Sequence, residues 1–388
     1  MPSETTITQT PFRWRGTVLR AAAGVLHQTG LLRGAQHLAR THVLERSAKL
    51  FRLRRALGSR YGILCYHRVG TEGVPLFSRL APAVFAAQMR YLRRHYRIVS
   101  LTRLCTELED PPPDARPTLA ITFDDGYRDL YYFALPVLRK HDIPATIYLI
   151  GQCMETGEAP WYDRIFAALQ SVAGIELELE LDTRRRLEFD SPAARGEAAW
   201  QVVRYLCTLP DKRRREWCAE FNRKVGVAEE TLQGRMLTWE QVREMQHNRV
   251  DFGAHTMTHP VVSRLDEDGL ERELATAKHL LEAKLESTVG HFAYPFGKAP
   301  DCSEASQTAL SRAGYRSAVT TIAGLNLPGC DPLRLHRLQV GDDASLAMFA
   351  FNVTRMFLET AAEAPKANQN AETEVMRGVN SPRDSGSV

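Results

Sequence analysis

The sequence predicts an α/β protein built as a distorted (β/α) barrel. Short apolar runs rich in β-branched residues recur along the chain, and amphipathic stretches separate them, as in parallel βαβ units. Hydrophobic residues make up 44% of the 388 residues, enough to bury a sizeable core. We therefore expect one catalytic domain over residues 61–360, preceded by a basic arm over 1–60 and followed by a disordered tail over 361–388.

Seven apolar runs are candidate strands, and two stretches between them have clear helical patterns. The strands are expected at residues 63–66, 97–100, 119–123, 145–150, 250–254, 291–294 and 317–320. The helices are expected at 82–95 and at 266–284, where charges recur at i,i+4. In α/β folds, polar residues at the ends of such strands usually carry the chemistry.

Asp124 and Asp125 directly follow the run 119–123. Two adjacent carboxylates at a buried strand end repel each other, so without a cation one of them tends to take up a proton. A metal ion removes this conflict if one Asp ligates it while the other stays free to take a proton from water. The alternative is an ordinary turn, because Asp and Gly both suit turn geometry.

His255 and His259 follow the run 250–254. Their spacing of four residues predicts two imidazoles on one face of a helical turn, although a solvated helix face gives the same pattern. Two His and one carboxylate leave open positions on zinc, which is typical of a catalytic site. Because both polar pairs directly follow strand-like runs, we expect a divalent metal, Zn²⁺ by default, with Co²⁺, Ni²⁺ or Fe²⁺ able to use the same ligands.

The motifs together resemble those of the polysaccharide deacetylases, the NodB-homology enzymes of carbohydrate esterase family 4. The resemblance covers about residues 61–345 and implies a barrel of the polysaccharide deacetylase type. Its three main motifs are Thr-Phe-Asp-Asp-Gly-Tyr at 122–127, Phe-Gly-Ala-His-Thr-Met-Thr-His-Pro at 252–260 and Phe-Ala-Tyr-Pro-Phe-Gly at 292–297. It further implies hydrolysis of an N-acyl group, most often N-acetyl, on a sugar of a glycan.

The resemblance also implies a role for each matching residue. Asp124 would be the general base, and Asp125, His255 and His259 the metal ligands. Tyr294 would donate a backbone N–H to the oxyanion, and His336, which ends a Leu-x-Leu-His sequence, would protonate the leaving amine.

Two features depart from the family pattern. In the subgroup with Ala-Tyr-Pro-Phe-Gly, the late segment usually reads Pro-Arg-Ile or similar, so the alternative for His336 is a different structural position. Many members carry an Arg two residues before the Pro of the third motif, where it holds the base, but here that position is Ala293. The partner that orients Asp124 is therefore open, and Arg337 and Arg68 are the candidates.

Five residues are candidate substrate contacts. His67 ends another apolar run and is expected to face the pocket, although a structural histidine would fit the same position. Trp239 is expected to stack on a sugar ring, with packing as its alternative role. Pro295 and Phe296 of the third motif, together with Arg337, complete this set.

Two segments extend the predicted barrel. Residues 157–236 form a long, charge-dense and mostly helical insertion, which either caps the cleft or decorates the surface. No residue in it can be assigned a role. Residues 1–60 carry many Arg and little acid among apolar residues, so they predict a basic amphipathic helix that either contacts an anionic membrane surface or packs on the barrel.

The remaining features indicate location and partners. No apolar run approaches the roughly 18 residues that span a bilayer, and the seven Cys are scattered without a Cys-x-x-Cys motif. We therefore expect a cytoplasmic protein, peripheral to the inner membrane face if the arm binds there. The net charge of +4 gives no case for nucleic acid.

The expected substrate is an N-acylated glycan or a lipid-linked sugar during assembly of a surface polysaccharide or glycolipid. The alternatives are an amidase or deformylase acting on a non-polymeric amide, and a glycan-binding homologue without turnover.

Overall fold

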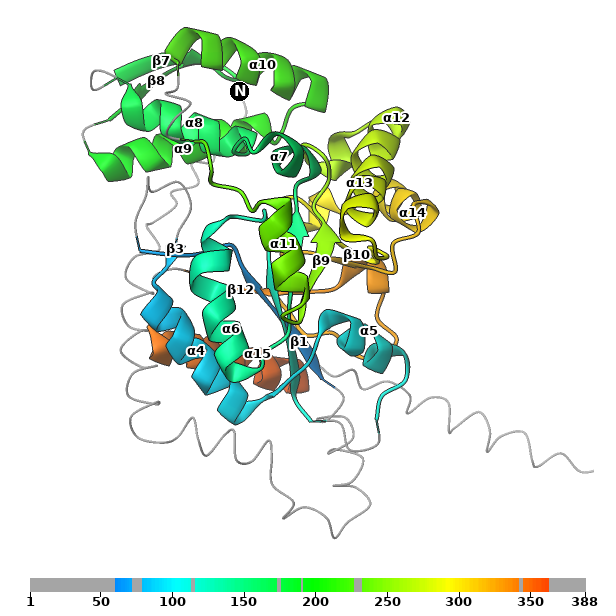
Figure 1. The fold of residues 1–388 in the computed structure, drawn as a ribbon. Helices are drawn as coiled ribbons and strands as arrows, with labels where there is room; N and C mark the ends of the chain where they lie inside the picture. The colour runs from blue at the N-terminus through cyan, green and yellow to red at the C-terminus, as the bar shows by residue number, and fades with distance from the viewer. Residues whose placement is uncertain are drawn as a thin grey trace, which may run out of the picture.

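The computed structural model describes residues 60–71, 79–112, 116–172, 176–189, 191–226, 232–341 and 345–362 (Figure 1). Its centre is an eight-stranded parallel sheet with the order β11-β10-β9-β6-β5-β1-β12, in which β4 also pairs with β5. The strands of this sheet are β1 (Tyr61–Tyr66), β4 (Arg97–Ile98), β5 (Thr118–Phe123), β6 (Ala145–Leu149), β9 (Val250–Ala254), β10 (His291–Ala293), β11 (Ser317–Val319) and β12 (Leu338–Gln339).

The two edges of the sheet meet at the segment 335–339. On one side, Leu338 of β12 pairs with Leu64 of β1, and on the other side Leu335 forms a parallel bridge with Val319 of β11. The backbone N–H of Thr320 also donates to the Leu335 carbonyl over 2.8 Å. One short irregular segment thus closes the sheet on itself, and the predicted distorted (β/α) barrel is confirmed.

Helices cover the outer face of the sheet and share one large hydrophobic core with it. Figure 1 shows α4, α6 and α15 on one flank and α12, α13 and α14 on another. The helices around the barrel are α4 (Pro82–His95), α5 (Leu101–Glu109), α6 (Leu135–His141), α7 (Gly151–Thr156), α11 (Trp239–Gln246), α12 (Glu267–Leu270), α13 (Thr276–Leu285), α14 (Glu304–Arg312) and α15 (Leu346–Ala362). Shorter elements are β2 (Arg68–Val69), β3 (Arg79–Leu80), η2 (Leu130–Ala134), η4 (Val262–Arg264), η5 (Glu271–Ala275), η6 (Ala299–Asp301) and η7 (Pro332–Arg334).

The inside of the barrel has a second, smaller core. Ile63 of β1, Ala120 of β5 and Tyr148 of β6 meet there, and helix α5 packs against them with Leu101 and Leu104. Side chains along a strand alternate between its two faces, so every second residue of β1 and β5 points inward. The inward-pointing positions of β1 and β5 continue past the ends of the strands to His67 and Asp124, respectively.

Residues 157–236 were predicted as a mostly helical insertion. The structure gives them a core of their own, formed by α8 (Trp161–Ser171), α9 (Pro192–Leu206) and α10 (Asp211–Val225) with a hairpin of β7 (Glu176–Glu180) and β8 (Arg184–Glu188). The hairpin was not predicted. Strand β7 alternates glutamate with leucine, whereas β8 begins with three arginines and contains one leucine. Leu179 and Leu187 are buried in the insertion core, and Glu178 stands opposite Arg186.

Most predicted elements are confirmed. The helix at 82–95 has the expected bounds, whereas the stretch 266–284 is divided among α12, the π-helical turn η5 and α13. None of the described helices is both long enough and apolar enough to cross a membrane. The predictions for the basic arm, apart from Arg60, and for the tail from residue 363 onward lie outside the described residues.

Candidate active site

Several strands end around a single cavity of about 680 Å³. Asp124 and Asp125 follow β5, His67 follows β1 and His255 follows β9, and all four line this cavity. Because the strands are parallel, their carboxyl ends meet at the same edge of the barrel. The expectation that strand-end polar residues converge is therefore met by the fold.

Asp125, His255 and His259 form a compact group of potential metal ligands. The Nε2 atoms of both histidines lie 3.6 Å from the same Asp125 Oδ1, and all three side chains are buried. That separation is too long for a hydrogen bond, but it matches ligands that share one ion, because metal bonds of about 2.1 Å in a tetrahedron place ligand atoms about 3.4 Å apart. The donor set therefore fits a divalent metal.

The orientation of the two histidines also suits a metal. His255 Nδ1 lies 2.7 Å from the Ala293 carbonyl, which accepts a hydrogen bond from the ring and leaves Nε2 with its lone pair toward Asp125. Burial lowers the pKa of His255 to about 4, so its imidazole is neutral near pH 7. Burial also lowers the pKa of His259 well below its usual value. Neutral imidazoles are the form that binds a metal ion.

The predicted helical turn between the histidines is wrong. Residues 255–260 form a loop after β9, with left-handed backbone angles at Thr256 (φ 64°) and His259 (φ 58°). The buried Glu273 holds this loop, because its Oε2 accepts the backbone N–H groups of Met257 and Thr258 over 2.9 and 2.8 Å. The two imidazoles thus meet because the loop folds back on itself.

Asp124 is held by a buried arginine. The Arg337 guanidinium donates from Nη1 to Asp124 Oδ1 and from Nη2 to Oδ2, each over 2.7 Å, and Arg337 is fully buried. Its Nε also donates to the Thr320 carbonyl over 2.7 Å, and Nη1 to Thr122 Oγ1 over 3.2 Å. Arg337 is therefore the residue that orients Asp124 in place of the arginine that is missing at Ala293. Arg68, the other candidate, pairs with Asp129 over 2.7 Å.

The two adjacent aspartates have opposite pKa shifts. Burial by itself would raise the pKa of Asp124, but the charge and hydrogen bonds of Arg337 outweigh it and lower the pKa below its usual value. For Asp125, burial raises the pKa well above its usual value, and the charge of Asp124 adds to this effect. This is the carboxylate conflict expected from the sequence, and a cation at Asp125 would relieve it.

His67 lies beside Asp124. A ring nitrogen of His67, Cys65 Sγ and a carboxylate oxygen of Asp124 all lie within 4.8 Å of one another. Cys65 Sγ donates to Asp124 Oδ2 over 3.4 Å. Sequence reasoning placed His67 in the pocket but did not find Cys65, although the alternation along β1 carries that signal.

His336, the predicted acid, is not brought to this cavity. The segment around it is extended, so Arg337 points into the barrel while His336 points to the other side, where its ring lies against Gly324. Its backbone N–H donates to Asn326 Oδ1 over 2.8 Å. The resemblance of 333–336 to a Leu-x-Leu-His motif was therefore misleading.

The Tyr294 assignment is also corrected. The Tyr294 N–H donates to the Val319 carbonyl over 3.1 Å, which continues the sheet ladder and leaves it unavailable to an oxyanion. Two residues further on, Phe296 lines the cavity, and its ring lies edge-on to His259 at 5.1 Å. Among the described residues, the Phe296 N–H has no hydrogen-bond partner.

Pro295 and Trp239 do not line the cavity. Pro295 is buried, and its carbonyl accepts the Gly297 N–H over 2.7 Å within the turn. Trp239 begins α11 on the outside of the barrel, where its Nε1 donates to Glu155 Oε1 over 3.0 Å and its ring lies 5.5 Å from Lys284 Nζ. Its role is therefore packing, which was the alternative considered from the sequence.

The insertion supplies the rest of the cavity wall. Tyr162 of α8 lines it, as do Trp200 and Arg204 of α9. Trp161, the first residue of α8, packs against the insertion core and donates from Nε1 to the His259 carbonyl over 3.0 Å. These residues were missed because no local pattern in the sequence indicates which part of a surface insertion folds back onto the barrel.

Comparisons with known proteins point to one protein family. A family model described as polysaccharide deacetylase matches residues 112–318. The chain is 22% identical over 295 residues to the Bacillus subtilis (strain 168) protein named "Putative polysaccharide deacetylase YxkH", and the match covers 76% of each chain.

Solved structures show a similar fold. The Streptococcus pyogenes deacetylase PplD, solved in complex with acetate, has a TM-score of 0.52 and 19% identity, over 76% of this chain and 98% of that one. A polysaccharide deacetylase from Bacillus cereus has a TM-score of 0.50 and 18% identity, over 76% of this chain and 69% of that one. Since the family model matches more than half of the 388 residues, the protein belongs to the polysaccharide deacetylase family.

Proposed function

We propose that this protein is a metal-dependent hydrolase that removes an N-acetyl group from a sugar within a glycan. Membership of the family indicates a hydrolase that deacetylates a glycan. The observation that carries the proposal is the pairing, in one cavity, of a potential metal triad at Asp125 with an ionised carboxylate at Asp124 that Arg337 holds.

Asp125, His255 and His259 are the residues that would hold the metal. Zn²⁺ is the ion we propose, and Co²⁺, Ni²⁺ or Fe²⁺ suit the same donors. When bound, such an ion supplies Lewis acidity toward the acyl carbonyl and lowers the pKa of water. Its charge would also offset that of Asp125, whose burial is otherwise unfavourable.

Asp124 is the proposed general base. Its lowered pKa keeps it ionised at neutral pH, and two hydrogen bonds from Arg337 fix the plane of its carboxylate. Because its carboxylate is already oriented, Asp124 can accept a proton from the attacking water without first having to rotate.

His67 is the proposed acid for the leaving amine, in place of His336. It lies next to Asp124 within the cavity. Burial lowers the pKa of His67 below its usual value, so its protonated ring is a stronger acid than a free imidazolium. Phe296 replaces Tyr294 as the proposed backbone donor, because its N–H has no partner among the described residues and its side chain lines the cavity. His67 would neutralise the negative charge that develops on the leaving nitrogen, and the Phe296 N–H would stabilise the charge that develops on the carbonyl oxygen.

The experiment that tests the proposal has two parts. Zinc is titrated into metal-free protein and into a His255→Ala/His259→Ala variant by calorimetry, and one tight site is expected only in the unchanged protein. Acetate release from an N-acetylglucosamine oligomer is then measured for the unchanged protein and for Asp124→Asn, which should retain zinc binding and lose turnover.

Asp142→Asn is the matched control, because Asp142 is exposed and pairs with Arg249 on the surface. It should leave both zinc binding and turnover unchanged. Zinc binding that survives in the double His variant would refute the ligand set. Turnover that survives in Asp124→Asn would refute the base. Acetate release from a small amide but not from the oligomer would favour the amidase alternative.

Several finer proposals depend on the sequence alone. They are the division into an arm over 1–60, a catalytic domain over 61–360 and a tail over 361–388, and a role in the assembly of a surface polysaccharide on a lipid-linked sugar. Membrane contact by the arm and a cytoplasmic location belong with them. Liposome flotation of the full chain and of a form without residues 1–60 tests the arm, since equal binding by both would refute it.

A further inference from the structure

Helix α9 of the insertion packs into the insertion core with one face and lines the active-site cavity with another. Ala199, Val202 and Leu206 are buried in the insertion core. Trp200 and Arg204 line the active-site cavity. Residues three and four apart lie on one face of a helix, so this second face continues through Val203 and on to the residues just after the helix. The insertion is therefore a wall of the cavity rather than a surface decoration.

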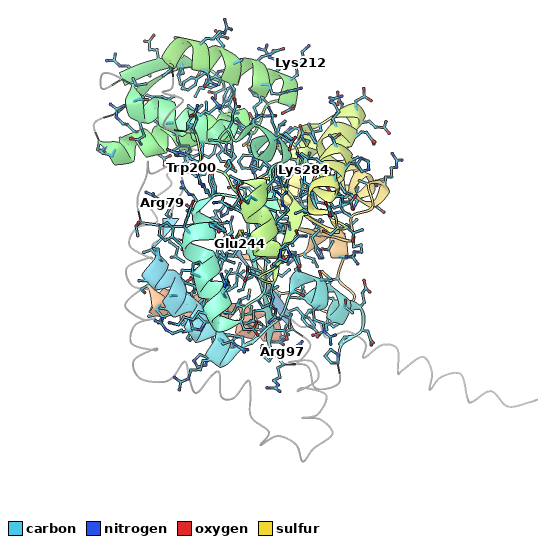
Figure 2. All side chains as sticks on the ribbon, in the orientation of Figure 1. Arg79, Arg97, Trp200, Lys212, Glu244 and Lys284 are labelled. Atoms are coloured by element: carbon cyan, nitrogen blue, oxygen red, sulfur yellow. The ribbon has the colours of Figure 1, made fainter. Side chains whose placement is uncertain are left out.

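Trp200 presents an aromatic ring at this wall. Its ring packs edge-on against the ring of the buried Phe166, with the centroids 5.2 Å apart and an interplanar angle of 83°. This contact fixes the indole against the insertion core. Figure 2 shows Trp200 at the junction between the insertion and the barrel. An indole that is fixed in this way and only partly buried offers a surface on which a sugar ring can stack.

Three exposed cationic side chains line the same cavity as this ring. Arg204 comes from α9, Arg264 ends η4 after β9, and Lys298 follows the third motif after β10. All three are solvent-exposed. They come from three separate segments of the chain, so only the tertiary fold brings them to one cavity.

The acidic groups of the cavity are mostly neutralised by other partners. Asp124 is paired with Arg337, and Asp125 would be offset by the proposed metal. Asp301 accepts the Lys298 backbone N–H over 2.9 Å and is the remaining acid on the wall. Arg204 has a partner in Glu197, but both side chains are more than half exposed, so this pair contributes little. The open part of the cavity therefore carries an excess of positive charge.

We propose that this wall is a subsite for an acidic group on the glycan, next to the sugar that loses its acetyl group. Trp200 stacks on the neighbouring sugar, and Arg264 and Lys298 bind its carboxylate or phosphate. The proposal rests on the deacetylase function proposed above. It adds that the preferred substrate is anionic, either through an acidic sugar or through a phosphate at the end of the chain.

The test compares three probes with the zinc-loaded full chain. They are the neutral tetramer of N-acetylglucosamine, the same tetramer with one terminal sugar oxidised to a uronate, and the same tetramer with a phosphate at its reducing end. Acetate release gives KM and kcat for each. We expect an anionic probe to have a KM about three- to tenfold lower than the neutral one at low salt, with kcat similar and the difference reduced at high salt. The probe with the larger effect identifies the source of the anion.

Variants assign the effect to residues. Lys298→Gln and Arg264→Gln should each raise KM for the anionic probe about two- to fivefold and leave KM for the neutral probe unchanged. Lys298→Arg, which keeps the charge, should restore the lower KM for the anionic probe. Trp200→Ala should raise KM for all three probes, and Trp200→Phe should do so less. The matched control is Lys212→Gln, which removes the same charge from the insertion at the exposed start of α10, away from the cavity (Figure 2).

The failure of this inference can be told apart from failure of the proposed function. Equal KM values for neutral and anionic probes, or equal effects of Lys298→Gln and Lys212→Gln, would overturn the subsite while turnover continues. If no probe releases acetate, binding of the probes to zinc-loaded Asp124→Asn is measured by calorimetry. Tighter binding of an anionic probe there would support the subsite without turnover, and equal binding would overturn it.

Discussion

The bond between Arg337 and Asp124 gives the sharpest test of the site. In Arg337→Met, Asp124 would lose the two donors that contact its carboxylate over 2.7 Å, while the Thr320 carbonyl and Thr122 hydroxyl would each lose a donor. Asp124 is only 2% exposed, so water does not replace these contacts. Breaking such a buried pair from one side costs about 3–5 kcal/mol of unfolding free energy.

The sign of the pH dependence follows from the lowered pKa of Asp124. A lowered pKa in the folded state contributes stability that is present above the ordinary pKa of 3.8 and is lost as the pH falls through the folded value. The full difference between the unchanged protein and Arg337→Met is therefore expected at pH 7, and it should shrink in strong acid. Turnover should fall about a hundredfold or more, because the base loses both its orientation and its charge partner.

The assay is chemical denaturation of the zinc-loaded protein together with acetate release. Arg337→Lys keeps the charge but cannot span both carboxylate oxygens, so it should recover part of the stability and little of the activity. Arg213→Met is the matched control, because Arg213 pairs with Glu216 on the exposed face of α10 and should change stability by less than about 1 kcal/mol. Unchanged turnover in a folded Arg337→Met would refute the orienting role.

Three further predictions concern His67, Glu273 and Asp163. His67→Asn should lower kcat about a hundredfold or more, whereas His336→Asn should change it by less than about twofold; acetate release that depends on His336 instead would restore the original assignment. Glu273→Gln should weaken zinc binding about ten- to a hundredfold in calorimetry, because the loop that carries His259 loses the carboxylate that accepts its backbone N–H groups. Glu271→Gln, at an exposed position, is the control. Burial raises the pKa of Asp163 from 3.8 to about 6, so its contribution to stability is full below pH 3.8 and is lost, by up to about 3 kcal/mol, as the pH rises through 6. Denaturation curves of Asp163→Asn between pH 4 and 7 should lack this dependence, and an identical dependence in the variant would contradict it.

The sequence by itself determined the barrel strands and the residues at their ends. Apolar runs of four to six residues are a local signal, and the polar residues that follow them converge because parallel strands end on the same edge. Asp124, Asp125 and His255 could therefore be placed without a structure. The same alternation along β1 carried the signal for Cys65.

Only the tertiary structure decided which arginine and which histidine serve the site. Arg337 and His336 are neighbours in the sequence, and nothing local indicates which of them points inward; the pairing of 335–339 with β11 and β1 decides it. The Tyr294 N–H is likewise occupied only because β11 lies beside it. The position of Trp200 at the cavity depends on how the insertion packs on the barrel. Local sequence patterns specify elements and their ends, whereas contacts between segments distant in the chain depend on packing that no single segment encodes.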